Sequence, residues 1–223
     1  MISAISSALP FLLDGLWMTF KISLATIFFG SLLGAMVGTV RASPLRSLSF
    51  VLGLYIHALR GTPFLIHLYA VYFMLPATGV AWLQFDAITA SIIALSLYTS
   101  TYVAEVVRAA LEAVPRGQVE AARSVGMSTL QTLRHVVVPQ ALKLMIPPMG
   151  GVYVIIIKGT SIVSVVGVSE LVRAGEQAAQ RDPSHMLVIY GLVALMYLAY
   201  CYPVLRIVRW LETRFGAGVT INI

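Results

Sequence analysis

The chain has 223 residues, of which 59% are hydrophobic and only 11% charged, and its formal net charge is +6. Soluble domains average about 25% charged residues, so a soluble fold would leave a large excess of apolar surface in water. The composition therefore predicts an all-α integral membrane protein. The basic excess indicates topology, because Lys and Arg accumulate in cytoplasmic loops, and no basic face on a soluble module points to a nucleic-acid partner.

Five apolar stretches have the roughly 20 residues that a helix needs to cross a bilayer. They are residues 16–40, 48–75, 87–110, 139–158 and 186–208. The second contains Pro63, which removes a backbone donor, so a kink or a break is expected there. The apolar stretch 160–168 is too short to cross, and we expect it to re-enter the membrane against protein or to lie at the interface.

The apolar stretches belong to one transmembrane domain over residues 1–223. We expect no cleaved signal, because the first thirteen residues have no basic segment before their apolar ones. One side of the membrane holds ten of the fifteen basic residues, and the excess marks that side as cytoplasmic. These ten are Arg41, Arg46, Arg108, Arg116, Arg123, Arg134, Lys143, Arg206, Arg209 and Arg214. With five spans, the N-terminus is then outside and the C-terminus is cytoplasmic.

A polar segment, residues 115–138, interrupts the apolar pattern and is called the elbow below. Residues 118–124 favour a helix, Gly126 suits a left-handed helix end, and Ser128 can cap a second helix over residues 129–136. Pro139 suits the first turn of the following span. The pattern predicts a cytoplasmic helical hairpin, with an amphipathic helix on the inner membrane surface as the alternative.

The spacing within the elbow is Glu-Ala-Ala, three residues, Gly, nine residues, then aliphatic, any residue, aliphatic and Pro. The residues are Glu120, Ala121, Ala122, Gly126, Val136, Val138 and Pro139. This pattern resembles the cytoplasmic signature of ATP-binding cassette (ABC) importer permeases, although that family more often has Ile and Leu at the two aliphatic positions. The resemblance implies that Glu120, Ala121, Ala122, Gly126 and Pro139 couple the permease to an ATPase.

Four further segments resemble the branch of that family that carries polar amino acids, the histidine-, glutamine- and cystine-type permeases. They are residues 59–63, 102–108, 158–161 and 168–171. The resemblance runs from about Leu9 to Phe215 and implies the transmembrane fold of type I ABC importers in a bacterial inner membrane. Many relatives carry an acidic or amide residue where Gly159 stands, so a cationic substrate is the less expected one.

The resemblance also implies the partners of the chain. They are two cytoplasmic ATP-binding subunits, a second permease subunit in a homodimer or a heterodimer, an extracytoplasmic solute-binding protein, membrane lipid and an amino-acid substrate. The chain has no Gly-x-x-x-x-Gly-Lys-Ser/Thr phosphate loop, so ATP and magnesium would be used by the partners. No nucleophile, base and orienting group occur together, and no cysteine and histidine cluster has the spacing of metal ligands. We therefore expect a transport subunit that is not itself an enzyme and has no cofactor or metal of its own.

Ionisable residues in or near the spans are the candidates for the substrate route. Arg60 could bind a substrate carboxylate, form a structural ion pair, or extend its charge toward water near a broken helix. Glu105 and Arg108, three residues apart on one helical face, are expected to pair with each other. Lys158, Thr160 and Ser161 could line the entry route, dock the binding protein or anchor the helix at the interface.

Two other functions remain open from the residues alone. An ion-coupled secondary transporter would use Arg60, Glu105 and the histidines. It predicts acidic residues in the middle of a span or an inverted repeat, and the sequence shows neither. A non-transporting scaffold would explain the elbow but gives no role to Arg60. Gly30, Gly34 and Gly38 recur every four residues, which fits close helix packing, either within the subunit or at a dimer contact.

Overall fold

The computed structural model describes residues 2–215, and every regular element in that range is helical, which confirms the all-α prediction. The α-helices are α1 (Ile2–Arg41), α2 (Arg46–Arg60), α3 (Phe64–Tyr69), α4 (Ala87–Glu112), α5 (Arg116–Ser124), α6 (Thr129–Thr132), α7 (Val138–Gly159), α8 (Leu171–Arg181) and α9 (Met186–Phe215). Shorter π or 3-10 turns are η1 (Ala70–Met74), η2 (Pro76–Thr78), η3 (Ala81–Leu83), η4 (Leu133–Val137), η5 (Thr160–Val166) and η6 (Pro183–His185). Residues 1 and 216–223 of the domain predicted over 1–223 lie outside the described range.

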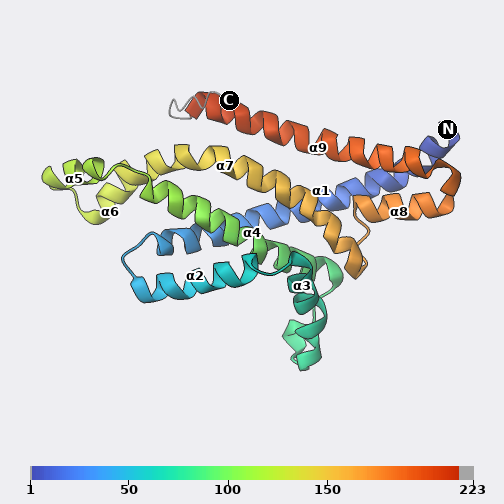
Figure 1. Ribbon diagram of the computed structural model, residues 1–223, viewed down its shortest axis with the longest axis horizontal. Helices are drawn as coiled ribbons and strands as arrows, with labels where there is room; N and C mark the ends of the chain where they lie inside the picture. The colour runs from blue at the N-terminus through green and yellow to red at the C-terminus, as the bar shows by residue number, and fades with distance from the viewer. Residues whose placement is uncertain (1, 216–223) are drawn as a thin grey trace.

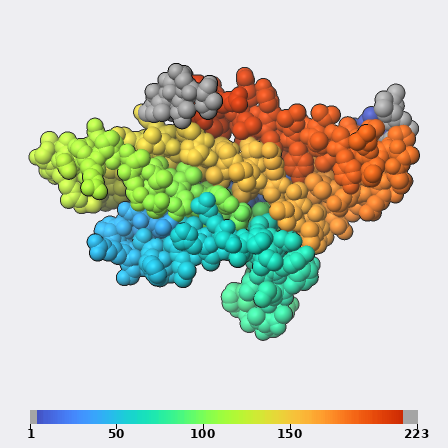
Figure 2. Space-filling model, viewed as in Figure 1, coloured from blue at the N-terminus to red at the C-terminus, as the bar shows by residue number. Residues whose placement is uncertain are grey.

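Within the described range, four helical segments are long and apolar enough to cross a membrane, and α2 with α3 makes a fifth if the bent pair is counted as one span. The α1–α2 loop, α5 and α6 lie toward one end of the molecule, and the start of α1 and α8 lie at the other (Figure 1). The elbow forms a lobe that projects at its end (Figure 2). The helices thus run lengthwise between a polar end and the end that holds α8.

Helix α1 begins at Ile2, fourteen residues before the start predicted at residue 16. Pro10 lies inside the helix and does not end it. Ala8 and Leu12 are buried in one cluster with Leu171 and Ala174 of α8. Because Pro10 removes only one backbone donor, packing against α8 is enough to keep the helix continuous.

The second predicted span, 48–75, is broken into two helical halves. Helix α2 ends at Arg60, Pro63 has extended backbone angles (φ −60°, ψ 137°), and α3 starts at Phe64. The two halves meet at 103°. The break predicted at Pro63 is confirmed, because proline cannot donate to the preceding turn and also disfavours helical backbone at Thr62 before it.

Helix α7 belongs to one unbroken helical segment of 38 residues, Thr129–Val166. The second elbow helix and the stretch 160–168 were predicted as separate elements, and both are extensions of this span. The π turn η4 ends at Val137, two residues before Pro139, so the hydrogen-bond ladder widens in the turn before the proline that lacks a donor. Gly167, at φ +89°, ends the segment in a left-handed conformation.

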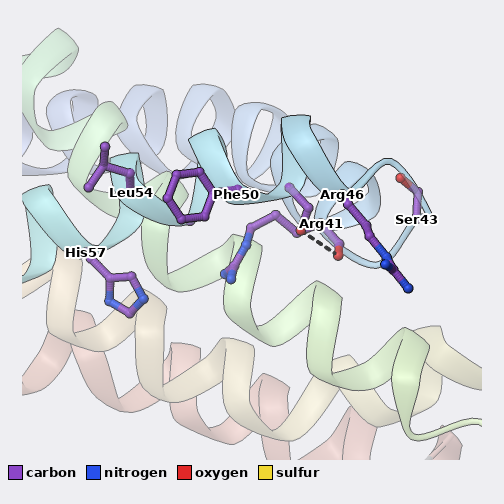
Figure 3. A pocket seen from close by; sticks show the side chains of 8 residues that line it. Arg41, Ser43, Arg46, Phe50, Leu54 and His57 are labelled. Atoms are coloured by element: carbon purple, nitrogen blue, oxygen red, sulfur yellow. Dashed lines mark hydrogen bonds between the residues drawn. The ribbon is translucent and has the colours of Figure 1, made fainter.

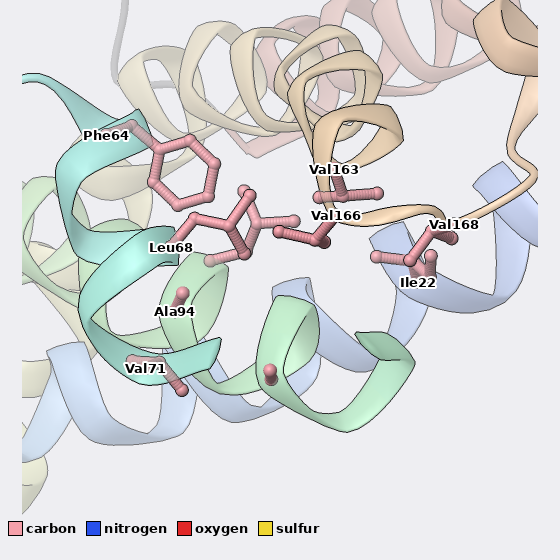
Figure 4. Close-up of a cluster of buried hydrophobic side chains, with 10 residues drawn as sticks. Ile22, Phe64, Leu68, Val71, Ala94, Val163, Val166 and Val168 are labelled. Atoms are coloured by element: carbon pink, nitrogen blue, oxygen red, sulfur yellow. The ribbon is translucent and has the colours of Figure 1, made fainter. Parts of the chain in front are cut away.

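The outer extension η5 packs largely against other helices of the protein. Val163 and Val166 pack in one core cluster with Ile22 of α1 and Leu68 of α3 (Figure 4). All four side chains are at least nine-tenths buried. The cluster therefore ties the end of the long helix to α1 and to the second half of the broken span.

The glycine repeat of α1 packs within the subunit, against α4. A Cβ atom at Gly30 would lie 2.7 Å from Thr99 Cβ, and one at Gly34 would lie 2.5 Å from Val103 Cβ. At Gly38 the nearest atom is a backbone oxygen of α4, at 2.5 Å. Since real Cβ atoms do not approach this closely, only glycine allows the two helices to lie at this distance.

Candidate functional site

The first arm of the elbow, α5, ends in a Schellman motif. The N–H of Gly126 donates to the carbonyl oxygen of Arg123 at 3.0 Å, and the N–H of Met127 donates to that of Ala122 at 3.1 Å. Gly126 has φ +84°, the left-handed conformation predicted for it. The helix end is thus closed by backbone bonds, which fix the direction in which the chain leaves α5.

The second arm starts with a capping box. Ser128 Oγ accepts from the N–H of Gln131, and the side chain of Gln131 accepts from the N–H of Ser128 at 2.8 Å. Arg123 also donates to Thr129 Oγ1 at 2.9 Å and joins the two arms. The predicted cap at Ser128 is confirmed, and the turn is held by local bonds on both sides.

The resemblance implies that Glu120, Ala121 and Ala122 all couple the permease to an ATPase, but the three do not share one exposed surface. Glu120 and Ala121 are exposed, but Ala122 is buried against its own chain. Two exposed apolar side chains of the lobe were not predicted: Val125 is 78% exposed and Leu130 is 72% exposed. Their position in the sequence could have indicated this exposure, because both lie beside a helix end, where side chains point outward.

Arg60 lies at the break of the second span, among ring side chains. Its guanidinium carbon is 4.6 Å from the centre of the Tyr102 ring. Tyr102 and Tyr98 share a hydrogen bond of 2.8 Å between their hydroxyls, and the Tyr98 ring lies 5.9 Å from that of His67. His67 Nε2 is in turn 2.6 Å from Thr62 Oγ1. No described carboxylate pairs with Arg60, so the guanidinium is free to meet an anion.

Glu105 and Arg108 pair as predicted, at 2.8 Å, but within a larger network. Arg41, the last residue of α1, forms an ion pair with the same carboxylate, and Arg108 also binds Glu112 at 2.6 Å. Arg41 is 64 positions from Glu105, which is why only the pair within one helix was predicted. The four charges balance and join the ends of α1 and α4.

The outer candidates are less available than their sequence pattern indicates. Thr160 is fully buried and donates to the carbonyl oxygen of Ile157 at 2.7 Å. Ser161 Oγ donates to the carbonyl oxygen of Lys158 at 2.9 Å. Lys158 itself is exposed and lines a cavity of about 480 Å³ between α7, α8 and α9. Ser161 is half-buried and lines the same cavity, so Lys158 and Ser161 can meet another molecule and Thr160 cannot.

Glu170 is a fully buried carboxylate that caps α8. It accepts from the backbone N–H groups of Val172 and Arg173, each at 2.9 Å, and from the Tyr197 hydroxyl at 3.1 Å. Burial raises the pKa of this carboxyl above its usual range, and the two backbone donors act in the opposite direction. The residue therefore ties α8 to α9. Among residues 2–215 no three His, Cys, Asp or Glu side chains lie close enough to hold a metal ion.

Comparison with known proteins agrees with this architecture. The family model of the binding-protein-dependent transport system inner membrane components matches residues 5–217. The L-cystine transport system permease protein TcyB of Bacillus subtilis (strain 168) is 33% identical over 210 residues, 94% of this chain and 88% of that protein. The glutamine transport system permease protein GlnP of Escherichia coli (strain K12) is 34% identical over 212 residues, 95% of this chain and 96% of that one.

Two solved structures share the fold. A chain from the crystal structure of an amino acid ABC transporter with histidines superposes with a TM-score of 0.86 at 31% identity, covering 96% of this chain and 98% of that chain. A chain of the MetNI methionine ABC transporter gives 0.74 at 24% identity, with 91% and 97% covered. The second likeness is one of fold alone.

Proposed function

The chain belongs to the family of binding-protein-dependent transport system inner membrane components, and on that premise we propose how its elbow and its broken second span work. It is a permease subunit of an ABC importer for amino acids in the inner membrane, and its partners are ATP-binding subunits and a substrate-binding protein. The observation that carries the proposed mechanism is the continuity of the helix that begins in the elbow and ends at Val166.

The elbow docks on the ATP-binding subunit through its tip. Val125 and Leu130 are exposed there, and their burial in a partner groove would contribute about 1.5–3 kcal/mol each if complete. Glu120 and Ala121 of the same helix are also exposed. Glu120 offers the partner a charge, and the small side chain of Ala121 lets the partner surface come close. Ala122, being buried, supports the shape of the elbow and does not touch the partner.

Movement of the ATP-binding subunits reaches the membrane through α6, η4 and α7. The second arm of the elbow is the first turn of the long helix, so no flexible linker separates the docking surface from the span. The Schellman motif at Gly126 and the capping box at Ser128 hold the first arm to the second. Displacement of the tip therefore tilts the span, and this rocking alternates access to the substrate route.

The substrate carboxylate binds Arg60. A guanidinium without a carboxylate partner, at a break where helix backbone opens, fits an α-carboxylate as a charged, bidentate hydrogen-bond partner. Tyr102 holds the guanidinium by its ring face and leaves the N–H edges free. The hydroxyls of Tyr98 and Thr62 offer further polar contacts to a small polar amino acid.

The N-terminus faces outward and the C-terminus faces the cytoplasm. The α1–α2 loop and the elbow, which carry much of the basic excess, lie toward the same end of the molecule (Figure 1). Labelling of single introduced cysteines with a membrane-impermeant thiol reagent tests this topology. Ser184→Cys is expected to react in intact cells, and Ser124→Cys only after permeabilisation; the reverse pattern contradicts it.

The mechanism is tested by uptake into proteoliposomes that hold the chain, its ATP-binding partner and a second permease subunit. We expect amino-acid uptake that needs ATP and the binding protein and that survives a protonophore. Uptake that follows a proton gradient without ATP would support an ion-coupled transporter instead. Tight binding of the ATP-binding subunit with no substrate flux would support a scaffold.

A further inference from the structure

A cationic cavity of about 460 Å³ lies beside the α1–α2 loop, and neither Arg60 nor any residue of the elbow lines it. Arg41, Arg46 and His57 contribute polar side chains to it, and Phe50 and Leu54 line its apolar part (Figure 3). None of the eight described residues that line it is acidic. The transport mechanism above gives this cavity no role.

The two arginines of the cavity differ in what they already bind. Arg41 is paired with Glu105, yet its Nε atom is buried and has no hydrogen-bond partner in the described part of the chain. Arg46 is exposed and takes part in no described ion pair. Since Arg41 and Glu105 belong to a network whose charges balance, Arg46 is the uncompensated charge, and the buried N–H of Arg41 is an unused donor.

The start of α2 adds a second cationic element. Arg46 is its first residue, and Leu45 at the N-cap position has no side-chain oxygen to accept from the first turn. The free N–H groups of a helix start favour an anion. The guanidinium of Arg41 lies against Gly53 of α2, with its nearest atom 3.5 Å from the position of a Cβ there.

The apolar wall identifies the kind of anion. Phe50 is 75% exposed and Leu54 is 63% exposed, on the same helix as Arg46 and between it and His57. A soluble phosphate would leave these side chains uncovered, whereas a phospholipid carries acyl chains next to its phosphate. We propose that this cavity binds the phosphate group of an anionic phospholipid of the cytoplasmic leaflet, with Arg46 and Arg41 as donors and Phe50 and Leu54 against an acyl chain.

The proposal rests on the topology given above, which puts this end of α1 at the cytoplasmic leaflet. Native mass spectrometry of the purified importer complex tests it, with phosphatidylglycerol or phosphatidylcholine added. We expect phosphatidylglycerol to bind the more tightly, and Arg46→Gln to weaken it about ten-fold, the effect of one charge-assisted hydrogen bond. Arg209→Gln, which removes an exposed arginine toward the end of α9, is the matched control and should change binding less than two-fold, the effect of one distant surface charge.

A second pair of variants leaves Arg46 in place. Leu54→Glu puts a negative charge on the cavity wall and should abolish phosphatidylglycerol binding, whereas Leu48→Glu adds the same charge to the same helix outside the cavity and should retain it. Equal binding of the two lipids, or equal loss in Arg46→Gln and Arg209→Gln, overturns the proposal. Binding of inorganic phosphate without binding of phosphatidylglycerol would show that the cavity takes a free phosphate, and it would overturn the lipid as the source.

The result is independent of transport. Lipid binding is measured on the purified complex without substrate or ATP. A failure to bind lipid would therefore leave the proposed ATP-driven uptake unaffected. Conversely, a complex that fails to transport but binds phosphatidylglycerol through Arg46 would support the site and contradict only the proposed mechanism.

Discussion

Arg60, at the end of α2, lies with its guanidinium carbon 4.6 Å from the ring centre of Tyr102 on α4. The contact lies at the break of the second span and joins its first half, α2, to α4, the helix that leads back toward the elbow. A cation over a ring face keeps its N–H edges available to a ligand. The proposed position of the substrate carboxylate rests on this pair.

Arg60→Gln removes the charge that the carboxylate needs. We expect the substrate concentration for half-maximal uptake to rise about ten-fold or more, since a hydrogen bond to a charged group contributes about 1.5–3 kcal/mol. Tyr102→Phe keeps the ring and loses only the bond to Tyr98, so its effect should be smaller than that of Tyr102→Leu. Initial rates of ATP-driven uptake measure both effects, and an unchanged half-saturation in Arg60→Gln contradicts the assignment.

Gly126→Val is expected to abolish transport while membrane insertion stays intact. A side chain in left-handed backbone costs about 1–2 kcal/mol, and a branched one more, so the Schellman motif would open and the two arms of the elbow would lose their fixed angle. Substrate-stimulated ATP hydrolysis and uptake report the loss. Gly191→Val is the control, because nothing lies within 4 Å of a Cβ there and φ is not positive; wild-type uptake in Gly126→Val would show that the turn is dispensable.

Charges at the tip of the elbow should separate docking from folding. Val125→Asp and Leu130→Asp place a carboxylate where the wild-type side chains are already exposed, so the melting temperature should stay close to wild type. Recovery of the ATP-binding subunit on affinity purification should fall at least ten-fold, as loss of about 1.5–3 kcal/mol of apolar burial requires. Thr213→Asp, exposed near the end of α9, should not change that recovery; full recovery with all three variants would remove the tip from the interface.

Gly34→Ala tests the contact of α1 with α4. The added Cβ would lie 2.5 Å from Val103 Cβ, and overpacking of this kind costs about 1–3 kcal/mol. We expect a lower unfolding temperature in detergent than for Gly151→Ala, where nothing lies within 4 Å of the new atom. Equal unfolding temperatures for the two variants would mean that α1 and α4 accommodate the added methyl group without loss of stability, and would contradict the prediction.

The pH dependence of stability should contain a contribution from Glu170. Its pKa is raised above the ordinary value of 4.5, chiefly by burial, so the folded state binds the proton more tightly than the unfolded state does. This contribution favours the folded state at low pH and is lost as pH rises from about 4.5 through the folded pKa. The stability difference between wild type and Glu170→Gln should shift against wild type as pH rises over that window in thermal unfolding scans, and parallel curves would contradict it.

The elbow and one ion pair of α4 could be predicted from the sequence because their structure is local. The left-handed Gly126, the Ser128 cap and the Glu105–Arg108 pair each depend on residues within one or two turns. The break at Pro63 follows from the same short-range chemistry. Helix extents were less certain: α1 runs through Pro10 because α8 packs on it, which no local pattern reveals.

The parts that the sequence could not predict are contacts between distant segments. Arg41 meets Glu105, and Arg60 meets Tyr102, across helices. In a chain that is apolar on most sides, periodicity does not say which face of a helix meets a neighbour, because lipid and protein interior have similar chemistry. The glycine repeat of α1 predicted a close contact, and only the structure identified α4 as its partner.

That glycine contact restricts how the molecule can rearrange. Along Gly30, Gly34 and Gly38 the backbone of α1 lies directly against Thr99, Val103 and the backbone of α4, with no α1 side chain in between, so neither helix can slide without a clash. Helices α1 and α4, further clamped by Arg41 and Glu105, therefore travel as a single rigid unit. The strain of opening and closing must then concentrate elsewhere, above all at the break Gly61–Pro63 of the second span.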